Sequence, residues 1–77
     1  MRELVEFIAR TLVDEPDQLR LRVYDREQQT IIELHAAQGD LGKLIGRQGR
    51  TARAIRTVLA AAGSKAGRRY VLDIVDE

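Results

Sequence analysis

The chain has no cysteine and no tryptophan, and it has one proline and three aromatic residues among its 77 positions. Without cysteine it can form neither a disulfide framework nor a zinc knuckle, so two usual supports of very small domains are excluded and a reducing compartment is allowed. Long hydrophobic runs are also lacking, because charged residues interrupt the first 13 positions. We therefore expect no signal peptide, no transmembrane segment and a cytoplasmic location.

The chain also lacks a strong net charge, because it has 13 basic and 12 acidic residues and a formal charge of +1. The charges are unevenly distributed, however. Residues 1–39 carry five arginines and eight acids, whereas residues 41–72 carry eight bases and no acid. A basic segment of this kind is expected at a site for a polyanion, although arginines can also gather on a solvated helix face by chance.

Hydrophobic periodicity predicts six elements in the order helix, strand, strand, helix, helix, strand. The expected ranges are 1–12 for the first helix, 19–24 and 32–36 for two strands, 41–45 and 50–62 for two helices, and 70–75 for the last strand. Residues 25–29 are expected to be a polar connection, Gly63 to end the third helix, and residues 63–67 to be a loop. These elements predict one α+β domain over residues 1–77, with helices packed on one face of a three-stranded sheet.

A GxxG turn, Gly46-Arg47-Gln48-Gly49, separates the second and third predicted helices. Glycines let the main chain pass close to a ligand, and the start of the following helix favours an anion. Arg50 and Arg53 follow at once. The turn therefore predicts a site for phosphate groups.

The order of elements and the stretch from Asp40 to Thr51 (DLGKLIGRQGRT) resemble the KhpA family of small bacterial proteins with a type II KH fold, order α-β-β-α-α-β. The opening helix running into residues 13–16 and the closing strand ending at residues 74–77 are similar to that family too. The resemblance implies binding of single-stranded RNA, with the backbone held on the GxxG loop. It also implies an RNA chaperone or post-transcriptional regulator that pairs with itself or with a larger KH-containing KhpB protein, in bacteria where the two influence cell elongation, cell shape and the cell wall.

The residues expected to contact RNA flank this turn. They are Lys43, Gly46, Arg47, Gln48, Gly49, Arg50 and Arg53 for the backbone, and Gly42 and Ile45 for the floor of a groove that takes the bases. None of the three aromatic residues lies in the motif, and stacking is worth about 1 to 3 kcal/mol per base in other single-strand binders. We therefore expect weak, sequence-tolerant binding by one copy. The alternative is a dimerisation or scaffold module in which the GxxG turn is structural.

No constellation for catalysis is visible, and no cofactor or metal is expected. His35 is the one histidine and lies in a strand pattern, while Ser64 is the one serine and lacks a Gly-x-Ser-x-Gly context. Gly42-Lys43 does not make a phosphate-binding P-loop, because Leu44 stands where Ser or Thr would hold magnesium. The sequence thus predicts a protein that is not an enzyme.

The third helix carries more apolar surface than packing on one sheet requires. Ala52, Ile55, Leu59 and Ala62 form one stripe at helical spacing, and a second stripe lies beside it. The second stripe consists of Ala54, Val58 and Ala61. We expect it to form a homodimer interface, and the alternative is that it packs under the 63–67 loop or the first helix.

Overall fold

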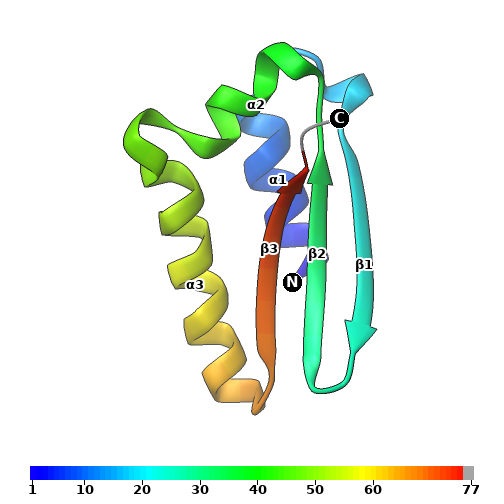
Figure 1. Cartoon of the computed structure of the whole chain (residues 1–77), viewed down its shortest axis with the longest axis vertical. Coiled ribbons are helices and arrows are strands. Elements are labelled where there is room, and N and C mark those ends of the chain that lie inside the picture. The colour runs from blue at the N-terminus through cyan, green and yellow to red at the C-terminus, as the bar shows by residue number, and fades with distance from the viewer. Residues whose placement is uncertain (76–77) are drawn as a thin grey trace.

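The computed structural model describes residues 1–75 and confirms the predicted order of elements (Figure 1). The helices and strands are α1 (Arg2–Leu12), β1 (Arg20–Arg26), β2 (Gln29–His35), α2 (Gln38–Ile45), α3 (Arg50–Ala66) and β3 (Arg69–Val75), with short 3-10 turns at Pro16–Gln18 and Arg47–Gly49. The mixed α+β architecture is that of a KH domain. Asp76 and Glu77, at the predicted end of the last strand, lie outside the described residues.

The sheet has the order β1-β2-β3, with β1 antiparallel and β3 parallel to the central strand β2. The β1–β2 connection is shorter than the predicted segment 25–29, because only Glu27 and Gln28 turn and Glu27 adopts φ 59°. Asp25 belongs to the strand despite its polarity. Its carboxylate accepts a hydrogen bond from the Thr30 hydroxyl at 2.9 Å and pairs with Arg68 at 2.7 Å.

The hydrophobic core lies between the helices and one face of the sheet. In Figure 1, α1 passes behind the sheet and α3 runs along β3. The core residues are Val5 and Ala9 of α1, Leu44 of α2, Ile55 and Leu59 of α3, Ile32 and Leu34 of β2, and Leu72 of β3, joined by Val13 and Leu19. Only part of the apolar pattern predicted for the first helix is buried in the core, because Met1 and Leu4 at its start are exposed.

The predicted end of the third helix at Gly63 is wrong, and so is the predicted loop at residues 63–67. α3 continues to Ala66, and Gly67 ends it in the left-handed region at φ 66°. Gly63 lies inside the helix because a Cβ there would collide with the Arg68 carbonyl oxygen and approach the Tyr70 ring at 3.3 Å. The glycine therefore permits the close return of β3 toward α3 and does not stop the helix.

No helix within residues 1–75 is long and apolar enough to cross a bilayer.

Candidate nucleic-acid interface

The GxxG turn joins α2 to α3 through three positions at which φ is positive. Gly46, Gln48 and Gly49 have φ values of 79°, 57° and 74°, and the Gly49 amide donates to the Gly46 carbonyl oxygen at 3.0 Å. At Gly46 a Cβ would lie 2.7 Å from the Thr51 Cβ, whereas a Cβ at Gly49 would meet nothing within 4 Å. Gly46 is therefore needed for close approach as well as for its dihedral angles.

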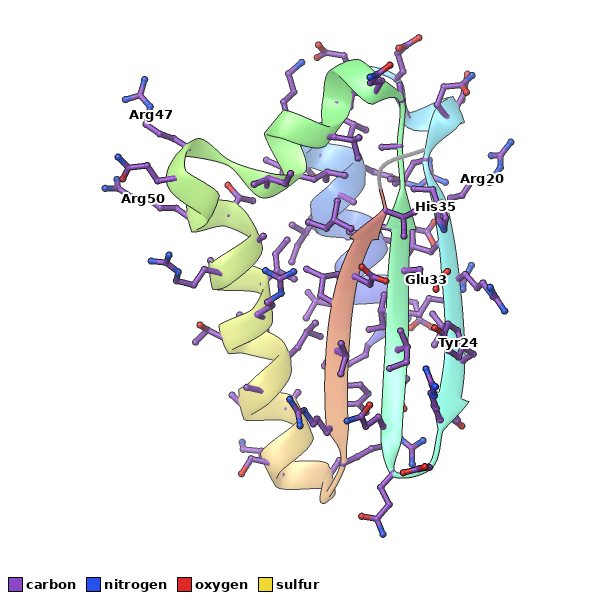
Figure 2. The ribbon with its side chains drawn as sticks, in the orientation of Figure 1. Arg20, Tyr24, Glu33, His35, Arg47 and Arg50 are labelled. Carbon is purple, nitrogen blue, oxygen red and sulfur yellow. The ribbon has the colours of Figure 1, made fainter. Side chains whose placement is uncertain are left out.

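Three arginines at the turn have no acidic partners among residues 1–75. Arg47, Arg50 and Arg53 are exposed, and no ion pair involves them in this part of the chain. The Arg50 guanidinium donates to the Gln48 side-chain oxygen at 3.2 Å. Figure 2 shows Arg47 and Arg50 pointing into solvent, away from the sheet.

The first amides of α3 add hydrogen-bond donors at the same place. Gly49 is the N-cap residue of α3. The Arg50 amide already donates to the Arg47 carbonyl oxygen, but no side chain caps the backbone N–H groups that follow it. The positive end of the helix dipole coincides with the exposed arginines, so the turn can hold an anion.

Lys43 has a different environment from the arginines. Its ammonium is bonded to the Asp14 carboxylate and lies 3.6 Å from an Asp40 carboxylate oxygen. The hydrogen bond to Asp14 is the main reason that the pKa of Lys43 is raised. Lys43 was predicted to contact the RNA backbone together with the arginines, but in the structure its charge is already balanced by the two carboxylates.

Asp40 was not among the predicted site residues, yet it holds α2 in place. Its side chain is 4% exposed, and its two carboxylate oxygens accept hydrogen bonds from the backbone amides of Asp14 and Glu15 at 3.1 and 3.0 Å. The hydrogen bond from the Asp14 amide is the main reason that the pKa of Asp40 is lowered. Its place as an acid in the first turn of a helix is a visible sequence signal, but partners 25 and 26 residues away are not.

The two residues predicted to form the floor of a base groove lie on the exposed side of α2. Gly42 is open to solvent, and Ile45 is 43% exposed immediately before the turn. A hollow of about 460 Å³ lies further along, between α3 and β3, and its lining includes Arg56, Ala60 and Tyr70. The Arg56 guanidinium donates to the Leu72 carbonyl oxygen at 3.3 Å and so joins α3 to β3. Arg56 is one of the eight bases of residues 41–72, and no contact was predicted for it.

The sequence profile described as "KhpA/KhpB, KH domain" matches residues 2–74, nearly the whole chain. This chain belongs to the KhpA/KhpB KH-domain family. The predicted resemblance is therefore confirmed.

Curated relatives agree with this assignment over nearly their full lengths. The RNA-binding protein KhpA of Borreliella burgdorferi is 53% identical over 74 residues, which cover 96% of this chain and 90% of that protein. The KhpA proteins of Halalkalibacterium halodurans and Aquifex aeolicus are 50% and 45% identical, each over 99% of this chain and over 100% and 96% of their own lengths. No solved structure matches this chain significantly.

One further surface of this KhpA/KhpB-family chain bears on the predicted dimer. Ala54, Val58 and Ala61 are all exposed on α3, with Val58 46% exposed, while Ile55 and Leu59 are buried. The second apolar stripe is therefore not covered by α1 or by the last turn of α3, so the alternative packing considered for it is wrong. Its use as an interface stays a prediction.

Proposed function

We propose that this protein binds single-stranded RNA by holding phosphate groups at the GxxG turn. The observation that carries the proposal is the group of exposed arginines without acidic partners around a turn that two glycines at positive φ, Gly46 and Gly49, make possible. Membership of the KhpA/KhpB family supports it, because several relatives are named RNA-binding proteins. Phosphate contacts are largely independent of base sequence, so the binding is expected to be weak and tolerant of sequence.

The bases would lie beside α2, over Gly42 and Ile45, where the chain offers apolar surface without an aromatic ring. Such binding suits an RNA chaperone or post-transcriptional regulator in the cytoplasm. We propose no catalytic role. A KhpB-type partner and an effect on cell elongation and the cell wall are proposed on the family resemblance alone.

The proposal is tested with the double variant Arg47→Asp/Gln48→Asp. Two carboxylates would replace a cation and an amide where phosphate is expected, so single-stranded RNA binding should fall below detection while the circular dichroism spectrum stays unchanged. The matched control is Arg2→Asp/Gln38→Asp, which makes the same change of charge at two exposed positions outside the turn. Wild-type affinity in the turn variant would refute the assigned site.

We further propose a homodimer in which each α3 meets its copy through Ala54, Val58 and Ala61. The support is the exposed apolar stripe on a small chain. A dimer presents two turns on one particle and raises the effective concentration of the second. Ala61→Arg should give a folded monomer with weaker RNA binding, and light scattering that finds the wild type monomeric at high concentration would refute the dimer.

A scaffold module with a structural GxxG turn is the competing function. RNA crosslinking in cells separates the two, because the RNA-binding function predicts that crosslinks disappear with the Arg47→Asp/Gln48→Asp variant. Crosslinks that persist, or that never form with the wild type, would favour the scaffold.

A further inference from the structure

The sheet has a second face that no helix within residues 1–75 covers. In Figure 1, α1 lies behind the sheet, and the face toward the viewer is open. We call it the open face. The strand register places on it Arg20, Arg22, Tyr24 and Arg26 of β1, Gln29, Ile31, Glu33 and His35 of β2, and Arg69, Val71, Asp73 and Val75 of β3.

Along β1 the open face is basic. Arg20, Arg22 and Arg26 are exposed, and their positions alternate with residues of the core face. Side chains two residues apart on one strand are separated by about 6.6 to 6.8 Å, so the arginines form a row along the strand. All three lie in residues 1–39, where acids outnumber bases, but the acidic residues next to them in the sequence do not share this row.

The middle of the row is held in a fixed arrangement by Glu33. The Tyr24 hydroxyl donates to one oxygen of the Glu33 carboxylate at 3.1 Å, while Arg22 and His35 lie 3.8 and 3.4 Å from the other. The Arg22 guanidinium also lies over the Tyr24 ring, 4.8 Å from its centre. Figure 2 shows this group on the open face, with Tyr24 and Arg20 on β1 and Glu33 and His35 on β2.

These contacts make the row available to an anionic partner. Glu33 is 14% exposed and already has three partners, so little of its negative charge faces solvent. The other acid on the open face, Asp73, lies on β3, across β2 from the arginine row. Arg20 donates only to the Asp17 backbone carbonyl oxygen, at 3.3 Å, and no ion pair involves Arg26 within residues 1–75.

We propose that Arg20, Arg22, Tyr24 and Arg26 form a second RNA-contacting surface, the β1 track, which takes the phosphates of a strand extending beyond the GxxG turn. Guanidiniums in one row beside an aromatic ring suit a polyanion with stackable bases. The β1 track lies on the opposite side of the molecule from Arg47 and Arg50 (Figure 2), so a short RNA cannot reach both. The inference rests on the proposed RNA binding at the turn.

The test measures how the wild type and the variant Arg20→Gln/Arg26→Gln bind single-stranded RNA of two lengths. The variant leaves Arg22, Tyr24 and Glu33 intact. The control is Arg2→Gln/Lys65→Gln, which removes the same charge at exposed positions on α1 and at the end of α3. The probes are single strands of about four nucleotides, the length that a KH turn holds, and of about 16 nucleotides, which is long among single-strand sites. Affinity is measured by fluorescence anisotropy at 50 and 200 mM NaCl, and oligomeric state by light scattering.

The β1 track predicts that the variant binds the short strand as the wild type does and the long strand more weakly. Two lost phosphate contacts should lower the salt slope by about 1.4, so the loss of affinity between the two salt concentrations should shrink by roughly sevenfold. Equal behaviour of variant and control on the long strand would overturn the β1 track and leave the turn site standing. A change of oligomeric state that explains the weaker binding would also overturn it. Failure of the wild type to bind either strand would instead refute the proposed function.

Discussion

Two arginine-bearing regions, the GxxG turn and the β1 track, differ in what accompanies their positive charge. At the turn, Arg47, Arg50 and Arg53 lie at the start of α3, where no side chain caps the helix, and they form no ion pair within residues 1–75. On the open face, the arginine row shares its environment with a ring and a carboxylate. The turn can therefore supply backbone donors and helix dipole to a phosphate, whereas the sheet offers side chains alone.

The comparison indicates that formal charge in the sequence differs from charge available to a ligand. Lys43 lies three residues before the turn but is balanced by Asp14 and Asp40, while Arg20 and Arg26 come from the acidic part of the sequence and remain accessible. On this basis the turn is expected to be the primary site and the β1 track an auxiliary one.

The largest effect is expected from Gly46→Ala, which disrupts the turn without changing any charge. Gly49→Ala is the matched control, because both glycines have positive φ but only Gly46 faces a close neighbour. Gly49→Ala should cost about 1 to 2 kcal/mol for its left-handed backbone. Gly46→Ala should cost more, because φ 79° with ψ 168° is a region for glycine and its Cβ would collide with Thr51. Urea unfolding measures both. RNA affinity should fall much further for Gly46→Ala, and equal losses would mean that the contact with Thr51 is unimportant.

A smaller effect is expected from Arg50→Ala, measured as the salt dependence of binding to a four-nucleotide strand. Three phosphate contacts give a slope of about −2, or nearer −3 if Lys43 joins them, and losing one contact should flatten the slope by about 0.7. Arg20→Ala is the control and should leave the short-strand slope unchanged. A wild-type slope near zero would contradict a site built on phosphate contacts.

Asp14→Asn should strengthen binding slightly, because it releases Lys43 toward the turn. Exposed ion pairs contribute little, so the gain is expected to be up to about fivefold, with a slope steeper by about 0.7. Asp17→Asn removes the same charge from an exposed residue with no ion pair to Lys43 and serves as the control. Equal gains in both variants would indicate a general effect of net charge.

The smallest effect on RNA binding is expected for Asp40→Asn, which acts on stability. The pKa of Asp40 is lowered in the folded state, so its contribution is present above its unfolded value of about 3.9 and is lost as pH falls through the folded value. The pKa of Asp25 is lowered as well, chiefly by the Thr30 hydrogen bond, so Asp25→Asn is a comparison variant. The free energy of unfolding, measured with urea between pH 3 and 7, should fall less steeply toward low pH for Asp40→Asn than for the wild type. The same pH dependence in both proteins would contradict the role assigned to Asp40.

The features that were predicted correctly depend on residues that lie close together in the sequence. The order of elements and the GxxG turn follow from residues adjacent along the chain, and the buried stripe of α3 follows from helical spacing. The end of α3 was mispredicted because Gly63 has the residue type of a helix stop but is kept by the approach of Arg68. Lys43 and Asp40 could not be interpreted from sequence, because Asp14 lies 29 and 26 residues from them.

On the open face, too, contacts between residues that are far apart in the chain could not be predicted from the sequence. Alternation along β1 is visible in the sequence, and it separates Leu21 and Val23 from the arginines. The pairing with β2 that brings Glu33 beside Arg22 and Tyr24 depends on the strand register, which residues far apart in the chain determine together.

Whether the GxxG turn is the RNA site can be measured by mapping amide chemical shifts while a four-nucleotide single-stranded RNA is added to the isotope-labelled protein. We expect the largest shifts on the amides of Gly46, Arg47, Gln48, Gly49 and Arg50, with the amides of β1 unchanged. Shifts confined to the exposed stripe of α3 or to the sheet, with no change in the amide shifts of the turn at saturating RNA, would contradict the assignment of the RNA site to the turn.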